Sequence, residues 1–72
     1  EYSMKLSARN QLKGTIVDIQ EGAVNAIVKI NVGNDNILTA DITVQSVKDL
    51  GLVVGKEVVA VIKSTSVMVG VE

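Results

Sequence analysis

Apolar and polar residues alternate along much of the chain with the spacing of β-strands. The clearest stretch runs from residue 24 to 32, where Val24, Ala26, Val28, Ile30 and Val32 fall on every second position. A period of two places these side chains on one face of a strand and the intervening residues on the other. The pattern therefore predicts a strand over residues 24–32 with one buried face.

Four further segments carry a strand pattern and are rich in β-branched residues, which favour strands. They are residues 12–19, 37–42, 57–63 and 67–71. Residues with turn-forming preferences separate the strands: Glu21-Gly22, Gly33-Asn34-Asp35-Asn36 and Ser64-Thr65-Ser66, with Val54-Gly55-Lys56 ahead of residue 57. The sequence thus predicts five strands.

The spacing changes to that of a short helix between the third and fourth strands. Thr43 is a suitable N-cap, Gly51 suits the position after the last turn, and Val44, Val47 and Leu50 repeat at threefold spacing. Three strands, a helix and two strands follow the order of an OB-type barrel. We therefore predict an all-β chain: an OB-like five-stranded Greek-key barrel with one short helix between strands 3 and 4.

The size of the chain favours self-association. A domain of 72 residues buries only about 60% of the surface that its unfolded chain exposes, which leaves it marginally stable alone. With no Cys and no His it lacks disulfides and the usual zinc ligands. Residues 58–62 are apolar on both faces of the predicted fourth strand. We expect another subunit to cover the outer face, the alternative being a scatter of surface valines.

Composition argues against several functions. Without His, Cys, a close carboxylate pair or a Gly-rich phosphate loop, catalysis is not expected. No apolar run is long enough for a membrane span and no signal-peptide pattern is present, so we expect a cytoplasmic protein. A net charge of −1 and a single aromatic residue, Tyr2, also disfavour the oligonucleotide binding common among OB barrels.

Three short segments concentrate the groups that a small oxyanion requires. They are residues 7–10, 43–46 and 63–66, which supply hydroxyl groups, backbone amides and the cations Arg9 and Lys63. Thr43 and Ser46 lie at the start of the predicted helix, where unpaired amides favour an anion. The sequence therefore predicts an oxyanion site if the fold brings these segments together.

Each segment also has an ordinary structural interpretation. Arg9 can be a solvated charge ahead of the first strand, and Thr43 can be a helix cap. Lys63 can simply end an apolar strand, with residues 64–66 as the following turn. Taken one at a time, these interpretations are favoured, and only convergence of the segments would make a site.

Several blocks in order resemble the molbindin (Mop) family. They are Ser7-Ala8-Arg9-Asn10-Gln11-Leu12-Lys13-Gly14, Glu21-Gly22-Ala23-Val24-Asn25, Ile42-Thr43-Val44-Gln45-Ser46-Val47, Leu50-Gly51-Leu52, Gly55-Lys56-Glu57-Val58 and Ile62-Lys63-Ser64-Thr65-Ser66-Val67-Met68. The resemblance covers nearly the whole chain. It implies a single Mop domain over residues 7–72, after an unpatterned segment 1–6.

The resemblance implies a function as well as a fold. It implies a homo-oligomer, a hexamer arranged as a trimer of dimers, which binds molybdate and also tungstate between subunits. In such a site Ser7, the Ala8 amide and Arg9 of one chain would meet Thr43, Ser46, Lys63 and Ser64 of a neighbour. A possible second site is placed at Val24 and Asn25. No bare metal cation is implied, and the chain has no aromatic platform for an organic cofactor such as a pterin.

Three functions from different classes remain open. The first is a molybdate store for intracellular molybdenum homeostasis. The second is a ligand-sensing or assembly module, like the Mop units fused to regulators and transporters. The third is an oligonucleotide-binding OB domain, which the single aromatic residue disfavours.

Overall fold

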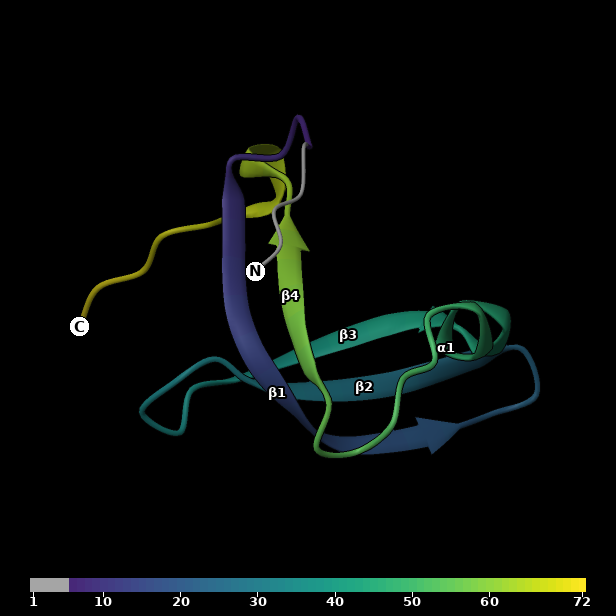
Figure 1. The fold of residues 1–72 in the computed structure, drawn as a ribbon. Helices are drawn as coiled ribbons and strands as arrows, with labels where there is room; N and C mark the ends of the chain where they lie inside the picture. Colours follow the sequence, from purple (N-terminus) through teal and green to yellow (C-terminus); the bar gives the residue numbers. More distant parts are fainter. Residues whose placement is uncertain (1–5) are drawn as a thin grey trace.

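The computed structural model describes residues 6–72 as a curled antiparallel sheet with one short α-helix (Figure 1). The elements are β1 (Asn10–Glu21), β2 (Asn25–Asn31), β3 (Ile37–Thr43), α1 (Val44–Asp49), β4 (Glu57–Ile62) and the 3-10 helix η1 (Ser64–Ser66). The strand order is β3-β2-β1-β4. The mainly-β class and the helix between the third and fourth strands are thus confirmed. The predicted unpatterned segment 1–6 lies outside the described residues except for Leu6.

Strand β1 is long because it serves two parts of the sheet. Its first half pairs with β4 and its second half pairs with β2, with a shift of register between Ile16 and Asp18. Figure 1 shows β1 and β4 rising together as an arm, while β2 and β3 cross its base at a steep angle. A bulge bends a strand and increases its twist. The β1–β4 arm (residues 10–15 and 57–62) therefore extends away from the rest of the sheet.

Helix α1 begins and ends where the sequence predicts. The Thr43 hydroxyl accepts a hydrogen bond from the N–H of Ser46 at 3.0 Å, which is N-cap geometry. Gly51 adopts a φ of +63°, and its N–H donates to the Lys48 carbonyl as in a Schellman motif. The ammonium group of Lys56 donates to the Gly51 carbonyl at 3.1 Å. Caps at both ends therefore stabilise a helix of only six residues.

The core lies between the curled sheet and α1. Its buried residues are Ile16, Ala26, Val28, Ile30, Val47 and Ala60. The predicted alternation of β2 is confirmed in the middle of the strand, but Val24 is 72% exposed because it lies in the turn before β2. Leu50 was predicted on the apolar side of the helix and is 61% exposed, because it is the C-cap beyond the last turn.

The predicted fifth strand is wrong within this chain. Among residues 6–72, the segment 67–71 pairs with no strand, and Figure 1 shows this segment leading away from the sheet after η1. The alternation of Val67, Val69 and Val71 expresses a preference for extended backbone, but a strand also requires a hydrogen-bonding partner. The four strands therefore leave β3 and β4 as open edges, where the predicted barrel would need a fifth strand between them.

The described chain leaves apolar side chains on its surface. On the outer face of the arm Val59 is half-buried and Val61 is exposed. The tail (residues 67–72) adds Met68 and Val69, each more than 90% exposed. Coverage of these side chains by another subunit stays a prediction. No helix among residues 6–72 is long and apolar enough to cross a membrane.

Candidate oxyanion-binding site

The free end of the β1–β4 arm brings two of the predicted segments together. Asn10 pairs with Ile62, so Arg9 and Lys63 each lie one residue beyond the last pair of this ladder. Figure 1 shows the residues before β1 and those after β4 at the same end of the arm. Two cationic residues that are more than fifty positions apart in sequence thus flank one end of the sheet.

The segment before β1 presents its polar groups to solvent. Ser7 and Arg9 are exposed, and Ala8 is half-buried. The Gln11 side-chain amide donates to the carbonyl of Ala8 at 3.1 Å. This bond ties the segment to the start of β1 through the carbonyl group, and the Ala8 N–H donates to no residue in the described range 6–72. The N–H predicted to contact the anion therefore remains available.

Within the described residues, the hydrogen bonds that hold the segment after β4 are between backbone groups. The carbonyl of Lys63 accepts from the N–H of Ser66 at 2.9 Å, and the carbonyl of Ser64 accepts from the N–H of Val67 at 3.3 Å. Lys63 caps η1 without using its side chain, and both Lys63 and Ser64 are exposed. The ammonium and hydroxyl groups are therefore not required to hold the turn.

The start of α1 places two hydroxyl groups side by side. Thr43 Oγ1 accepts from the Ser46 N–H and donates to Ser46 Oγ at 2.8 Å. Thr43 is exposed and Ser46 is half-buried. The helix has only six residues, so its dipole adds little, and the hydroxyl groups are the main polar feature of this end.

The structure groups the predicted site residues into two sets that lie apart within one chain. Ser7, Ala8 and Arg9 lie with Lys63 and Ser64 at the end of the arm. Figure 1 places α1 beside the start of β2 and the end of β3, away from the arm end. Thr43 and Ser46 lie at the start of this helix. One chain by itself does not assemble all of the predicted contacts, and the division of residues between two chains stays a prediction.

The possible second site lies beside α1. Gly22 and Asn25 close the turn before β2 through an N–H to carbonyl bond of 2.8 Å, and the N–H of Val44 donates to the carbonyl of Val24 at 2.8 Å. Asn25 also pairs in register with Thr43. The turn at Val24 and Asn25 and the start of the helix are therefore neighbours in space.

One charged neighbour of this turn was missed by the sequence analysis. The Asn25 side-chain amide donates to Asp41 Oδ1 at 3.1 Å. These residues are sixteen positions apart, and only the β2–β3 register brings them together. In the sequence Asp41 is simply one polar residue of an alternating strand.

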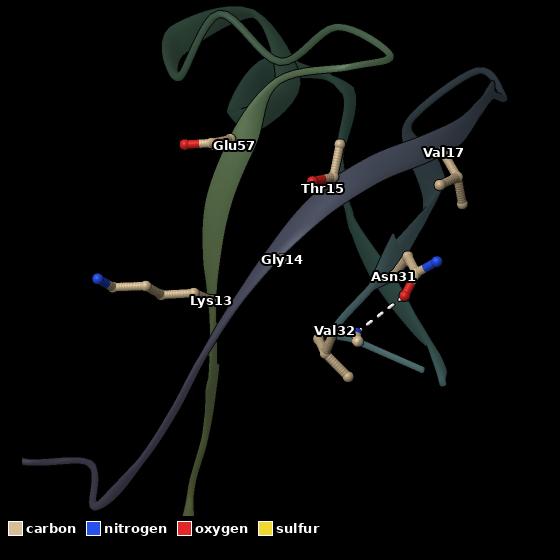
Figure 2. A pocket seen from close by; sticks show the side chains of 8 residues that line it. Lys13, Gly14, Thr15, Val17, Asn31, Val32 and Glu57 are labelled. Carbon is tan, nitrogen blue, oxygen red and sulfur yellow. Dashed lines mark hydrogen bonds between the residues drawn. The ribbon is translucent and has the colours of Figure 1, made fainter. Parts of the chain in front are cut away.

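A hollow on the outer face of the sheet contains none of the predicted site residues (Figure 2). It forms where β1 bends, and Figure 2 shows Lys13 and Glu57 projecting to the same side of it. The residues that line it are Lys13, Gly14, Thr15, Val17, Asn31, Val32, Gly33 and Glu57. Among residues 6–72 no cluster of three or more His, Cys, Asp or Glu could hold a metal ion.

Comparison with known proteins identifies the family. A model of the TOBE domain matches residues 6–69. A probable molybdenum-pterin-binding protein of Haemophilus influenzae is 59% identical over 69 residues, which cover 96% of this chain and all of that protein. This chain belongs to the TOBE-domain family, in its Mop (molbindin) branch. The family that the sequence resembled is therefore confirmed, as a single Mop unit.

Solved structures agree with this assignment. MopII from Clostridium pasteurianum, in an apo form, superposes with a TM-score of 0.87 at 43% identity, covering 93% of this chain and all of that one. The cytoplasmic molybdate-binding protein ModG, with molybdate bound, gives a TM-score of 0.80 at 52% identity over 85% of this chain and 43% of the ModG chain. The OB-like fold of this Mop chain is thus confirmed.

Proposed function

We propose that this Mop chain binds molybdate, and also tungstate, as a free oxyanion. The observation that carries the proposal is the β1–β4 register, which places Arg9 and Lys63 each one residue beyond the last pair at the end of the arm. Both are exposed cations, and Ser7, Ala8 and Ser64 lie next to them in the chain. The similarity to proteins named for molybdenum or molybdate supports the same ligand.

The chemistry of this group suits a tetrahedral dianion. Molybdate presents four oxygens that only accept hydrogen bonds, and hydroxyl groups, amides, ammonium and guanidinium groups all donate. Charge-assisted bonds from Arg and Lys are about twice as strong as neutral ones. Nothing in this arrangement acts on the ligand, so we propose a binding protein and not an enzyme. No organic cofactor is required.

We propose that the complete site forms between chains. The resemblance assigns Lys63 and Ser64 to the same chain as Thr43 and Ser46. Because the β1–β4 register places Lys63 at the same arm end as Arg9, we instead propose that one arm end supplies both cations and that Thr43 and Ser46 of a neighbouring chain supply further hydroxyl groups. This division is supported by the separation of the two sets within one chain (Figure 1). Binding would then depend on assembly, because neither set alone encloses the anion.

The proposed assembly is a homo-oligomer, a hexamer built as a trimer of dimers. Two features of one chain support self-association: the open edges of β3 and β4, and the exposed apolar tail. Open edges and large exposed apolar patches are usually covered in native proteins. We propose that this assembly serves as a cytoplasmic store of molybdate.

Replacing Val69 with aspartate is expected to dissociate the assembly. Val69 is 91% exposed in one chain, so the change costs the isolated fold almost nothing, whereas a carboxylate in a buried interface has a large desolvation penalty. Light scattering coupled to size exclusion would show the mass of a single chain or a smaller assembly. Val53→Asp, the same change at an exposed valine outside the tail, should leave the mass unaltered. Equal masses for the two variants would contradict a role for the tail in assembly.

Calorimetric titration with sodium molybdate tests the proposed ligand. We expect saturable heats at a fixed ratio of molybdate to subunits, even with sulfate at about 1 mM already in the buffer. Sulfate at this concentration would compete for an unselective anion site of millimolar affinity. The ratio of anion to subunit would show how sites are shared between chains. Sodium tungstate should displace molybdate. Flat heats in the presence of sulfate would contradict the proposal and leave an oligomeric OB domain with another ligand.

A further inference from the structure

The turn at Val24 and Asn25 carries a negative charge at the position proposed for a second oxyanion. Asp41 Oδ1 lies 3.1 Å from the Asn25 side-chain nitrogen, and both residues are exposed. The carboxylate therefore occupies one of the few side-chain donors at this turn. An oxyanion that binds here must compete with Asp41 for the Asn25 amide.

The strand register fixes Asp41 in this place. Asp41 pairs with Ile27 on β2, and Asn25 is the next residue along β2 on the same face. Diagonal neighbours of this kind are about 7–8 Å apart between their backbones, within reach of longer side chains. Thr43 lies directly opposite Asn25 on the same face. The register thus keeps Asp41 on the same face as Asn25 and within side-chain reach of the turn.

The turn has donors of its own that an anion could use. The N–H groups of Ala23 and Val24 donate to no residue within the described range, and both residues are exposed. The Val24 carbonyl is held by Val44, which keeps the turn in place. Two backbone amides and the Asn25 side-chain amide are therefore the donors at this turn that an oxyanion could use.

The cation that lies closest on this face by register is next to a second carboxylate as well as to Asp41. Lys29 is the other diagonal neighbour of Asp41, since it follows Ile27 by two positions on β2. Lys29 already has Asp18 directly opposite on β1. The face around the turn therefore remains unfavourable to a dianion.

We propose that the Asp41 carboxylate weakens oxyanion binding at the Val24–Asn25 turn. The arm-end site then has the higher affinity for the same oxyanion. This inference rests on the proposed function, because it ranks two sites for the same ligand. The chain thereby binds oxyanions with two unequal affinities. Asp41, which sets the difference in affinity, is not itself one of the donors proposed for the arm-end site or for the turn.

Replacing Asp41 with asparagine should strengthen the weaker class of site. Removing one like charge near an exposed dianion is expected to raise affinity roughly three- to tenfold at moderate salt. The probe is sodium molybdate, titrated calorimetrically into the wild type and into the Lys63→Ala background, where the arm-end class is weakened. Asp49→Asn is the matched control, because Asp49 also accepts from a side-chain amide, that of Gln45 at 2.8 Å, in an exposed pair on α1.

The outcomes separate this inference from the proposed function. A gain with Asp41→Asn that is absent with Asp49→Asn and lost in the Asp41→Asn/Asn25→Ala double variant would support the assignment. A gain no larger than that of the Asp49 control would overturn it, as would a gain that survives loss of Asn25. If the wild type binds molybdate while Asp41→Asn changes nothing, only this inference fails. If no variant binds molybdate, the proposed function fails as well.

Discussion

Replacing Lys63 with alanine is expected to weaken molybdate binding at least tenfold, equivalent to about 1.4 kcal/mol or more. Lys63 supplies one of the two positive charges at the arm end, and a dianion left with one cation loses a charge-assisted hydrogen bond. The loss should appear in the dissociation constant from calorimetry. It should not appear in the thermal unfolding of the ligand-free protein, because η1 is capped without the Lys63 side chain.

The size of this effect tests the proposed interface as well as the residue. Within one chain Lys63 is exposed, and an exposed ion pair is worth only about 0–1 kcal/mol. Removing one partner from a buried, hydrogen-bonded pair costs about 2–5 kcal/mol. A tenfold or larger loss is therefore expected only if a second chain covers the arm end when the anion is bound.

A lysine elsewhere on the sheet provides the control. Lys29→Ala removes the same charge from the exposed outer face of β2 and should change the molybdate affinity less than twofold, as long-range effects are screened by salt. Lys63→Arg should retain most of the affinity, since it keeps the charge. Equal affinities for the Lys63→Ala and Lys29→Ala variants would remove Lys63 from the site.

Replacing Gly14 with alanine is expected to destabilise the fold by about 2–3 kcal/mol. A Cβ atom at this position would lie 2.6 Å from Ile30 Cγ2 and 2.7 Å from the Asn31 carbonyl oxygen. The second contact is with the backbone of a paired strand, which cannot move without disturbing the β1–β2 ladder. Without a clash, alanine would stabilise a strand by about 0.5–1 kcal/mol relative to glycine. The steric clash at Gly14 therefore decides that the change in folding stability is a loss.

Thermal unfolding measures this effect. For a domain of this size, 2–3 kcal/mol corresponds to a fall in Tm of roughly 10–20 °C. Gln20→Ala is the control, because Gln20 is an exposed residue of the same strand outside the tail, and its effect should stay within about 0.5 kcal/mol. Both variants must be compared at one protein concentration, since assembly shifts the Tm. A Gly14→Ala variant as stable as the Gln20→Ala variant would contradict the close approach of β1 and β2.

Several elements could be predicted because their causes are local in sequence. The loop at residues 33–36 requires positive φ values, and Gly33, Asn34 and Asp35 adopt them. Helix α1 needs a hydroxyl at its N-cap and a glycine after its C-cap, and Thr43 and Gly51 meet these needs. Strand β2 needs alternation, and its middle residues are buried as expected. Each of these features depends on residues no more than a few positions apart.

The fifth strand shows where local pattern is insufficient. Residues 67–71 have the composition of a strand, but a strand forms only against a partner edge, and in the described part of the chain they pair with none. Backbone preference is a property of a segment, whereas pairing is a property of two segments in space. The same distinction explains Val24 and Leu50, whose apolar side chains fit the period but lie just outside the elements that would bury them.

The sequence by itself determined the family, the mainly-β class, the position of the helix and the residue types suited to an oxyanion. These depend on residue identity, spacing and short-range backbone chemistry. Only the tertiary structure decided which groups become neighbours: Arg9 with Lys63 through the β1–β4 register, and Asn25 with Asp41 through the β2–β3 register. It also separated Thr43 and Ser46 from the arm end. The physical reason is that a binding site depends on distances across strand ladders, which follow from pairing and the bend of β1 and not from any local sequence pattern.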